Sequence, residues 1–119
     1  MTGGYANDVV YQDNICMETG EQIQFDFMGF NKWEDFYSII DIIQRKIQPD
    51  ILRYHGLVDI NGYFEKDGLS VSIEFTEQVG NSLVYMIDEN KESFNMVSRW
   101  AKQIFDEMIS DRRKRNELR

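Results

Sequence analysis

The chain has 119 residues, of which 42% are hydrophobic and 13% aromatic, and this is enough for one domain to bury a core without disulfides or metal ions. Its formal net charge of −8 disfavours binding to nucleic acid or anionic membranes. Its single cysteine, Cys16, excludes an intramolecular disulfide. With no apolar run near the ~20 residues that cross a bilayer and no secretory leader pattern, we expect one cytoplasmic domain over residues 1–119, with a loose N-terminus at residues 1–7.

Residues 8–14 and 21–27 each have the alternation of a strand, and together they predict a hairpin that turns near Glu18-Thr19-Gly20. Asn31 and Glu34 have the spacing of a capping box, which predicts that a helix begins there. We expect this helix to end before Pro49. Its apolar stripe consists of Trp33, Phe36, Tyr37, Ile40, Ile43 and Ile47.

From residue 51 to residue 88 the apolar period changes to two, which predicts a three-stranded antiparallel meander. The expected turns are Lys66-Asp67-Gly68 and Gly80-Asn81. The apolar positions of the three strands are Leu52, Tyr54, Val58 and Ile60, then Leu69, Val71, Ile73 and Phe75, then Leu83, Tyr85 and Ile87.

A long amphipathic helix is predicted after Asn90, leading into a basic end at residues 111–119. Its stripe consists of Phe94, Val97, Ala101, Ile104, Phe105 and Met108, with Trp100 beside it. The predicted fold is therefore α+β: a mainly antiparallel five-stranded sheet with two helices packed on one face, in the order ββαβββα. The other face would be exposed, with outward positions at Gln22, Gln24, Asp26, Arg53, His55, Asp59, Ser70, Ser72 and Glu74.

Known catalytic patterns are missing from the sequence. A nucleophile needs a nearby base, and the one histidine, His55, falls on the polar side of its strand. Two potential ligands, Cys16 and His55, cannot make a zinc site, and no glycine-rich loop precedes a helix. We therefore expect neither a cofactor nor a metal, and we do not expect an enzyme.

Carboxylate chemistry is harder to exclude, because acids are abundant. One cluster of oxygen-bearing side chains lies at a predicted turn and consists of Asp59, Asn61, Glu65 and Asp67. It lacks the residue order of a calcium-binding EF-hand, so a solvated turn is the favoured interpretation. Glu74 or Asp26 could also face another acid across the sheet, as in a glycosidase.

The charge is unevenly distributed. Residues 1–44 hold eight acids and one base, and residues 111–119 hold five bases and two acids. The basic end is interpreted as a helix terminus rather than a nucleic-acid contact, since cations are favoured at the negative end of the helix dipole. A surface rich in acids attracts basic proteins, so the candidate partner-binding residues are Asp8, Asp13, Glu18, Glu21, Asp26, Glu34, Asp35 and Asp41.

In size, acidity and mixed α/β order, the whole chain resembles the small cytosolic immunity proteins of bacterial contact-dependent and other polymorphic toxin systems. This resemblance implies one-to-one binding of a toxin's C-terminal domain, often a nuclease, and assigns no individual residue. The leading hypothesis is an inhibitor that covers the basic active-site surface of a cognate toxin. The alternatives are a secretion-chaperone-like or adaptor protein that binds a basic segment, and a small carboxylate-dependent enzyme.

Overall fold

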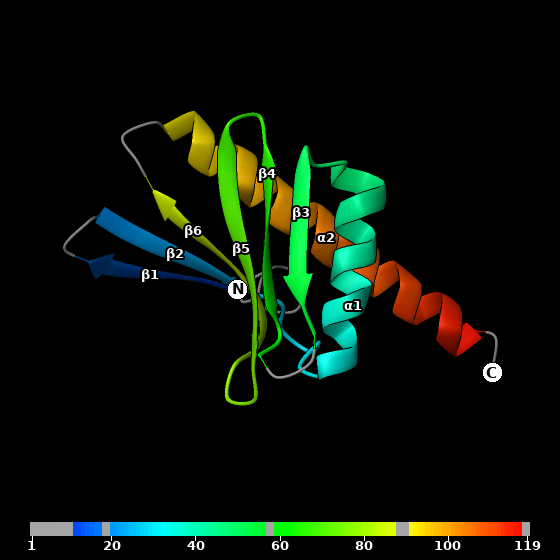
Figure 1. The fold of residues 1–119 in the computed structure, drawn as a ribbon. Helices are drawn as coiled ribbons and strands as arrows, with labels where there is room; N and C mark the ends of the chain where they lie inside the picture. Colours follow the sequence, from blue (N-terminus) through cyan, green and yellow to red (C-terminus); the bar gives the residue numbers. More distant parts are fainter. Residues whose placement is uncertain (1–10, 18–19, 57–58, 88–90, 118–119) are drawn as a thin grey trace, which may run out of the picture.

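The structure, a computed structural model, describes residues 11–17, 20–56, 59–87 and 91–117. Six strands form one sheet, and three helical segments accompany it (Figure 1). The strands are β1 (Tyr11–Met17), β2 (Gly20–Asp26), β3 (Ile51–His55), β4 (Asn61–Lys66), β5 (Leu69–Thr76) and β6 (Gly80–Ile87). The helical segments are α1 (Trp33–Ile42), the π-helix η2 (Ile43–Ile47) and α2 (Lys91–Glu117).

The sheet order is β1-β2-β6-β5-β4-β3, and every neighbouring pair is antiparallel. The first hairpin therefore joins the last strand of the meander through the β2–β6 pair. The predicted α+β class, with an antiparallel sheet and two helices on one face, is confirmed. The first strand lies further along the chain than the predicted 8–14, since β1 covers Tyr11–Met17. Residues 1–10 are outside the described residues.

The strand count of the described residues is six rather than five. The first strand of the predicted meander is divided into β3 and β4, which pair antiparallel with each other. Gly56 ends the first of them, and its carbonyl accepts a hydrogen bond from the Tyr37 hydroxyl at 2.8 Å. A contact from α1 therefore fixes the chain where it leaves β3.

The core lies between the helices and one face of the sheet. Phe27 stacks on Phe105 of α2 with ring centroids 6.5 Å apart, and Phe30 meets the same ring edge-on at 5.8 Å. Phe64 of β4 meets Trp100 of α2 at 5.7 Å. In Figure 1, α2 crosses behind the meander strands and α1 runs beside β3. The stripe predicted for the last helix therefore packs into the core.

The start of α1 differs by one residue from the predicted cap. Lys32, not Asn31, is the N-cap residue, and its backbone N–H donates to the Asp35 carboxylate at 3.2 Å. Asn31 instead packs against Gly80, which leaves no space there for a Cβ atom. The helix ends as predicted before Pro49, because Gln48 adopts a left-handed conformation (φ 55°) and its N–H closes the last π-turn on Ile43.

One of the two predicted meander turns is confirmed. Asp67 and Gly68 have φ of 54° and 80°, which is the backbone of a tight two-residue hairpin turn and explains the Asp-Gly pair. The other prediction is wrong, because Gly80 and Asn81 belong to β6 and the turn lies before them, at residues 77–79. Asn81 is fully buried, and its side-chain amide donates to the carbonyls of Phe30 and Lys32.

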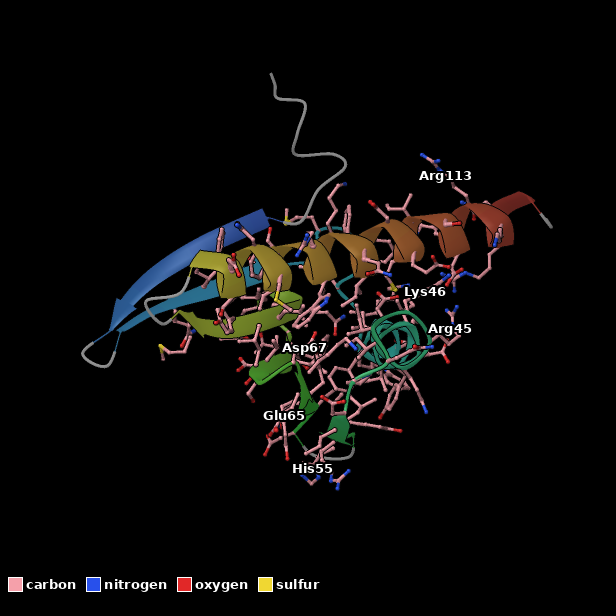
Figure 2. All side chains as sticks on the ribbon, turned by 90° about the horizontal axis from the view of Figure 1, so that it is seen from above. Arg45, Lys46, His55, Glu65, Asp67 and Arg113 are labelled. Carbon is pink, nitrogen blue, oxygen red and sulfur yellow. The ribbon has the colours of Figure 1, made fainter. Side chains whose placement is uncertain are left out.

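The predicted basic helix end is helical through Glu117, and residues 118–119 lie outside the described part. Arg112 is bound to the body of the protein, with its guanidinium 3.9 Å from the Phe30 ring centroid and Nη2 donating to the Gly29 carbonyl at 2.9 Å. Arg113, by contrast, is exposed and points away from the sheet (Figure 2).

Candidate functional site

The face of the sheet opposite the helices is polar, as the alternation of the sequence predicts. None of the nine predicted outward side chains is buried; Gln22, Gln24, Asp26 and Ser72 are half-buried and the other five are exposed. Figure 2 shows His55 and Glu65 on the side of the molecule away from α2. This face therefore remains open in the described part of the structure.

A groove of about 580 Å³ opens where β4 and β5 meet the start of α1. This volume is in the range of ligand-binding clefts. Three separate segments line it: Trp33 from α1, residues 59–62 before and within β4, and residues of β5 with the turn that follows. The complete lining is Trp33, Asp59, Ile60, Asn61, Gly62, Ser72, Glu74, Phe75, Thr76 and Glu77. We call this feature the acidic groove, because its lining holds three carboxylates and no base.

Trp33 forms the aromatic side of the acidic groove. Its side chain belongs to the predicted core stripe of α1, yet 53% of its surface is exposed. Its ring lies edge-on to Tyr37 at 6.0 Å, and Tyr37 in turn contacts Tyr54 at 6.4 Å. The hydrogen bonds from Asn81 to the two carbonyls just before α1 hold the chain that leads into Trp33. The indole is therefore held on a fixed backbone while its surface faces solvent.

The carboxylates of the acidic groove have no cationic partner among the described residues. The ion pairs found there join Arg45 to Asp41 at 2.8 Å and to Asp111 at 4.0 Å, and Lys102 to Asp106 at 3.3 Å. Asp59, Glu74 and Glu77 appear in none of them, and all three are exposed. Among the described residues, their charges are therefore balanced only by solvent and salt.

A second, smaller hollow of about 440 Å³ adjoins the acidic groove and shares Asn61, Gly62 and Ser72 with it. Two bases, Arg53 and His55, line this second hollow. The Arg53 guanidinium donates to the Leu52 carbonyl at 3.3 Å, so this cation is directed to its own backbone rather than to the three groove carboxylates.

The predicted partner-binding acids whose side chains the structure describes, four of the eight, lie on two elements, β2 and α1. Asp8 and Glu18 lie outside the described residues, and only the backbone of Asp13 and Glu21 is described, in β1 and β2. Asp26 is half-buried in β2 and accepts a hydrogen bond from Gln24 at 2.7 Å. The other three, Glu34, Asp35 and Asp41, belong to α1, which packs on the opposite side of the sheet.

Two of the α1 acids have intramolecular roles. Asp35 caps its helix, and Asp41 accepts a hydrogen bond from Arg45. That hydrogen bond is the main cause that raises the pKa of Arg45 above its usual value, and the nearby charges of Asp41, Asp111 and Glu107 add to it. Glu34 is exposed at the start of α1. Glu34 also directly follows Trp33, which lines the acidic groove.

The acids that line the groove were missed as a site, although alternation predicted Asp59 and Glu74 as outward positions. Glu77 follows β5 in the turn, where no periodicity applies. Only the pairing of β4 with β5, which sets Asn61 opposite Glu74, brings residues 59 and 74 to the same end of the sheet. No signal in the sequence joins them to Trp33.

The structure offers little for carboxylate catalysis or metal binding. Glu74 faces Asn61 and Ser82 across the sheet, and Asp26 faces Ser82, so neither has an acid directly opposite. Within the described ranges, no group of three or more His, Cys, Asp or Glu side chains is arranged to hold a metal ion.

No family model, no curated protein and no solved structure matches this chain. In the part of the chain that the structure describes, no helix is both long and apolar enough to cross a membrane.

Proposed function

We propose that this protein is an acidic protein-binding module of the immunity or inhibitor type, which neutralises a cognate toxin by covering its basic active-site surface. The observation that carries the proposal is the acidic groove, in which three carboxylates without a described cationic partner stand beside an exposed tryptophan. Exposed aromatic side chains are enriched at protein interfaces, and unpaired carboxylates attract the Lys and Arg clusters with which nucleases bind phosphates.

The net charge of −8 supports the same proposal. A field of this sign accelerates the encounter with a basic partner, and its effect weakens as salt screens it. The acidic groove adds a concave surface with an exposed tryptophan to this long-range attraction, and tryptophan is enriched among the residues that dominate interface affinity.

The test begins with the neighbouring genes: where the upstream gene encodes a large secreted protein with a variable C-terminal domain, that domain is co-expressed with this chain. We expect growth of the host to be rescued, and the affinity of the purified pair to fall about tenfold or more between low and high salt. Absence of rescue, or an affinity insensitive to salt, contradicts the proposal. Binding to a basic segment of the secreted protein without rescue would instead favour the adaptor alternative.

Matched variants connect the effect to the acidic groove. We expect Glu74→Gln with Glu77→Gln to slow association several-fold. The control, Glu65→Gln with Asp67→Asn, removes the same charge at the other end of the β4–β5 hairpin and should change the rate much less. Equal effects of the two pairs would show that total charge matters and the groove does not.

A further inference from the structure

The acidic groove has a lining that suits one particular side chain. Its volume of about 580 Å³ exceeds what a single guanidinium group fills, so a side chain can enter together with part of its backbone. The carboxylates of Asp59, Glu74 and Glu77 offer acceptors, and Trp33 offers an aromatic surface. No residue of the lining donates a positive charge to these acceptors.

We propose that the acidic groove binds an arginine side chain of the partner protein, which packs its guanidinium on the Trp33 indole and donates hydrogen bonds to the groove carboxylates. This inference rests on the proposed function and specifies how the partner is recognised. It concerns a side chain supplied by another protein, because Arg45 and Arg112, two well-anchored arginines of this chain, are bound elsewhere.

Arginine fits better than lysine for physical reasons. Its guanidinium is planar, weakly hydrated and able to make two parallel hydrogen bonds to one carboxylate, whereas an ammonium group is a compact and strongly hydrated charge. Tryptophan is the best aromatic partner for such a cation. The chain already contains a contact between an arginine and an aromatic ring, because the Arg112 guanidinium lies 3.9 Å from the centroid of the Phe30 ring.

The electrostatics of the free protein favour the same occupant. Three exposed carboxylates line one hollow, and a guanidinium bound there would be attracted by each of them. The bases of the neighbouring hollow, Arg53 and His55, do not line the acidic groove. A cationic segment that extended along the sheet toward Arg53 would meet a like charge.

The experiment uses two peptides with the ¹⁵N-labelled full chain: acetyl-Gly-Arg-Gly-amide, and the same peptide with citrulline, which keeps the shape and lacks the charge. The chain has two tryptophans, so two indole N–H signals report separately on exposed Trp33 and on Trp100, which is only 9% exposed. We expect the arginine peptide to shift the Trp33 indole and the amides of Asn61 and Gly62, with a Kd on the order of 1–10 mM. The Trp100 signal should not move.

Variants decide whether the geometry is right. We expect Glu74→Gln and Trp33→Leu each to weaken binding of the arginine peptide about three- to tenfold, with Trp33→Leu followed through the Asn61 and Gly62 amides. Asp67→Asn should leave it unchanged. Glu74→Gln should also leave the urea midpoint of unfolding nearly unchanged, because Glu74 is exposed and takes part in none of the ion pairs of the described residues.

Equal binding of the citrulline peptide, shifts away from the groove, or no shift at peptide concentrations of about 50 mM would overturn the inference. These results separate it from the proposed function. Toxin neutralisation that survives Glu74→Gln and Trp33→Leu would refute the arginine pocket alone, whereas arginine binding without any neutralisation would refute the inhibitor function and leave the pocket.

Discussion

Replacing Asn81 by alanine is expected to destabilise the protein by about 2–3 kcal/mol. The Asn81 side-chain amide is fully buried and donates to the Phe30 carbonyl at 2.9 Å and to the Lys32 carbonyl at 3.0 Å. Alanine removes both bonds. The Phe30 carbonyl is left buried without this donor, which costs about 1–3 kcal/mol. The partly buried Lys32 carbonyl still accepts the Asp35 N–H at 3.1 Å and loses only its second donor, which costs about 0.5–1.5 kcal/mol.

One term opposes this loss. The Asn81 Oδ1 atom is buried and has no hydrogen-bond partner in the described structure, so the wild-type protein already carries the desolvation of that oxygen, and the truncation relieves it. For this reason the expected loss of about 2–3 kcal/mol is taken from the lower half of the summed range.

Urea unfolding followed by circular dichroism measures the effect. With a typical slope of about 1–3 kcal/mol per molar urea, the midpoint should fall by roughly 0.7–3 M. Asn61→Ala, at an exposed position of β4, is the control and should change stability by no more than about 0.5 kcal/mol. If the two variants unfolded at the same urea concentration, the amide would not be holding the entry to α1, and the reasoning would be refuted.

Three further predictions concern stability. Arg112→Ala should lower the free energy of unfolding by about 1–2 kcal/mol, because it removes the contact with Phe30 and the hydrogen bond to the Gly29 carbonyl. In thermal unfolding of both variants, Arg113→Ala, at an exposed position, should leave the melting temperature unchanged. Gly56→Ala should cost about 1–3 kcal/mol, because a Cβ there overlaps the Tyr37 hydroxyl, and the loss should be smaller in a Tyr37→Phe background; equal losses would contradict this contact. Gly80→Ala should lower the melting temperature more than Gly68→Ala, since both have positive φ but only Gly80 would also meet Asn31.

Local chemistry explains which parts of the fold the sequence could predict. The Asp67-Gly68 turn follows from two residues that accept positive φ, and the α2 stripe follows from helical spacing. The division between β3 and β4 was missed because it involves Gly56 and Tyr37, which are 19 residues apart in the chain. Gly80-Asn81 was misassigned to a turn because the role of Asn81 depends on carbonyls about 50 residues away.

The candidate site was predictable only in its components. Alternation put Asp59 and Glu74 on the outward side, and composition indicated an acidic surface. The sequence could not indicate that both residues lie beside Trp33, because this requires the β4–β5 register and the packing of α1 at once. The concentration of charge in residues 1–44 pointed instead to α1 acids, of which Asp35 and Asp41 have partners within the chain.

Trp33 leaves 53% of its surface exposed, although helix α1 buries Phe36, Ile39 and Ile40 in the core. The fold uses Trp33 through its ring contact with Tyr37. The three carboxylates of the acidic groove are exposed, and none belongs to an ion pair of the described residues. Under the proposed binding, an arginine of the partner would cover the indole and neutralise part of this charge. Substitutions in the acidic groove should therefore reduce binding while preserving stability, whereas the loss of Asn81, which anchors the backbone before Trp33, should reduce both.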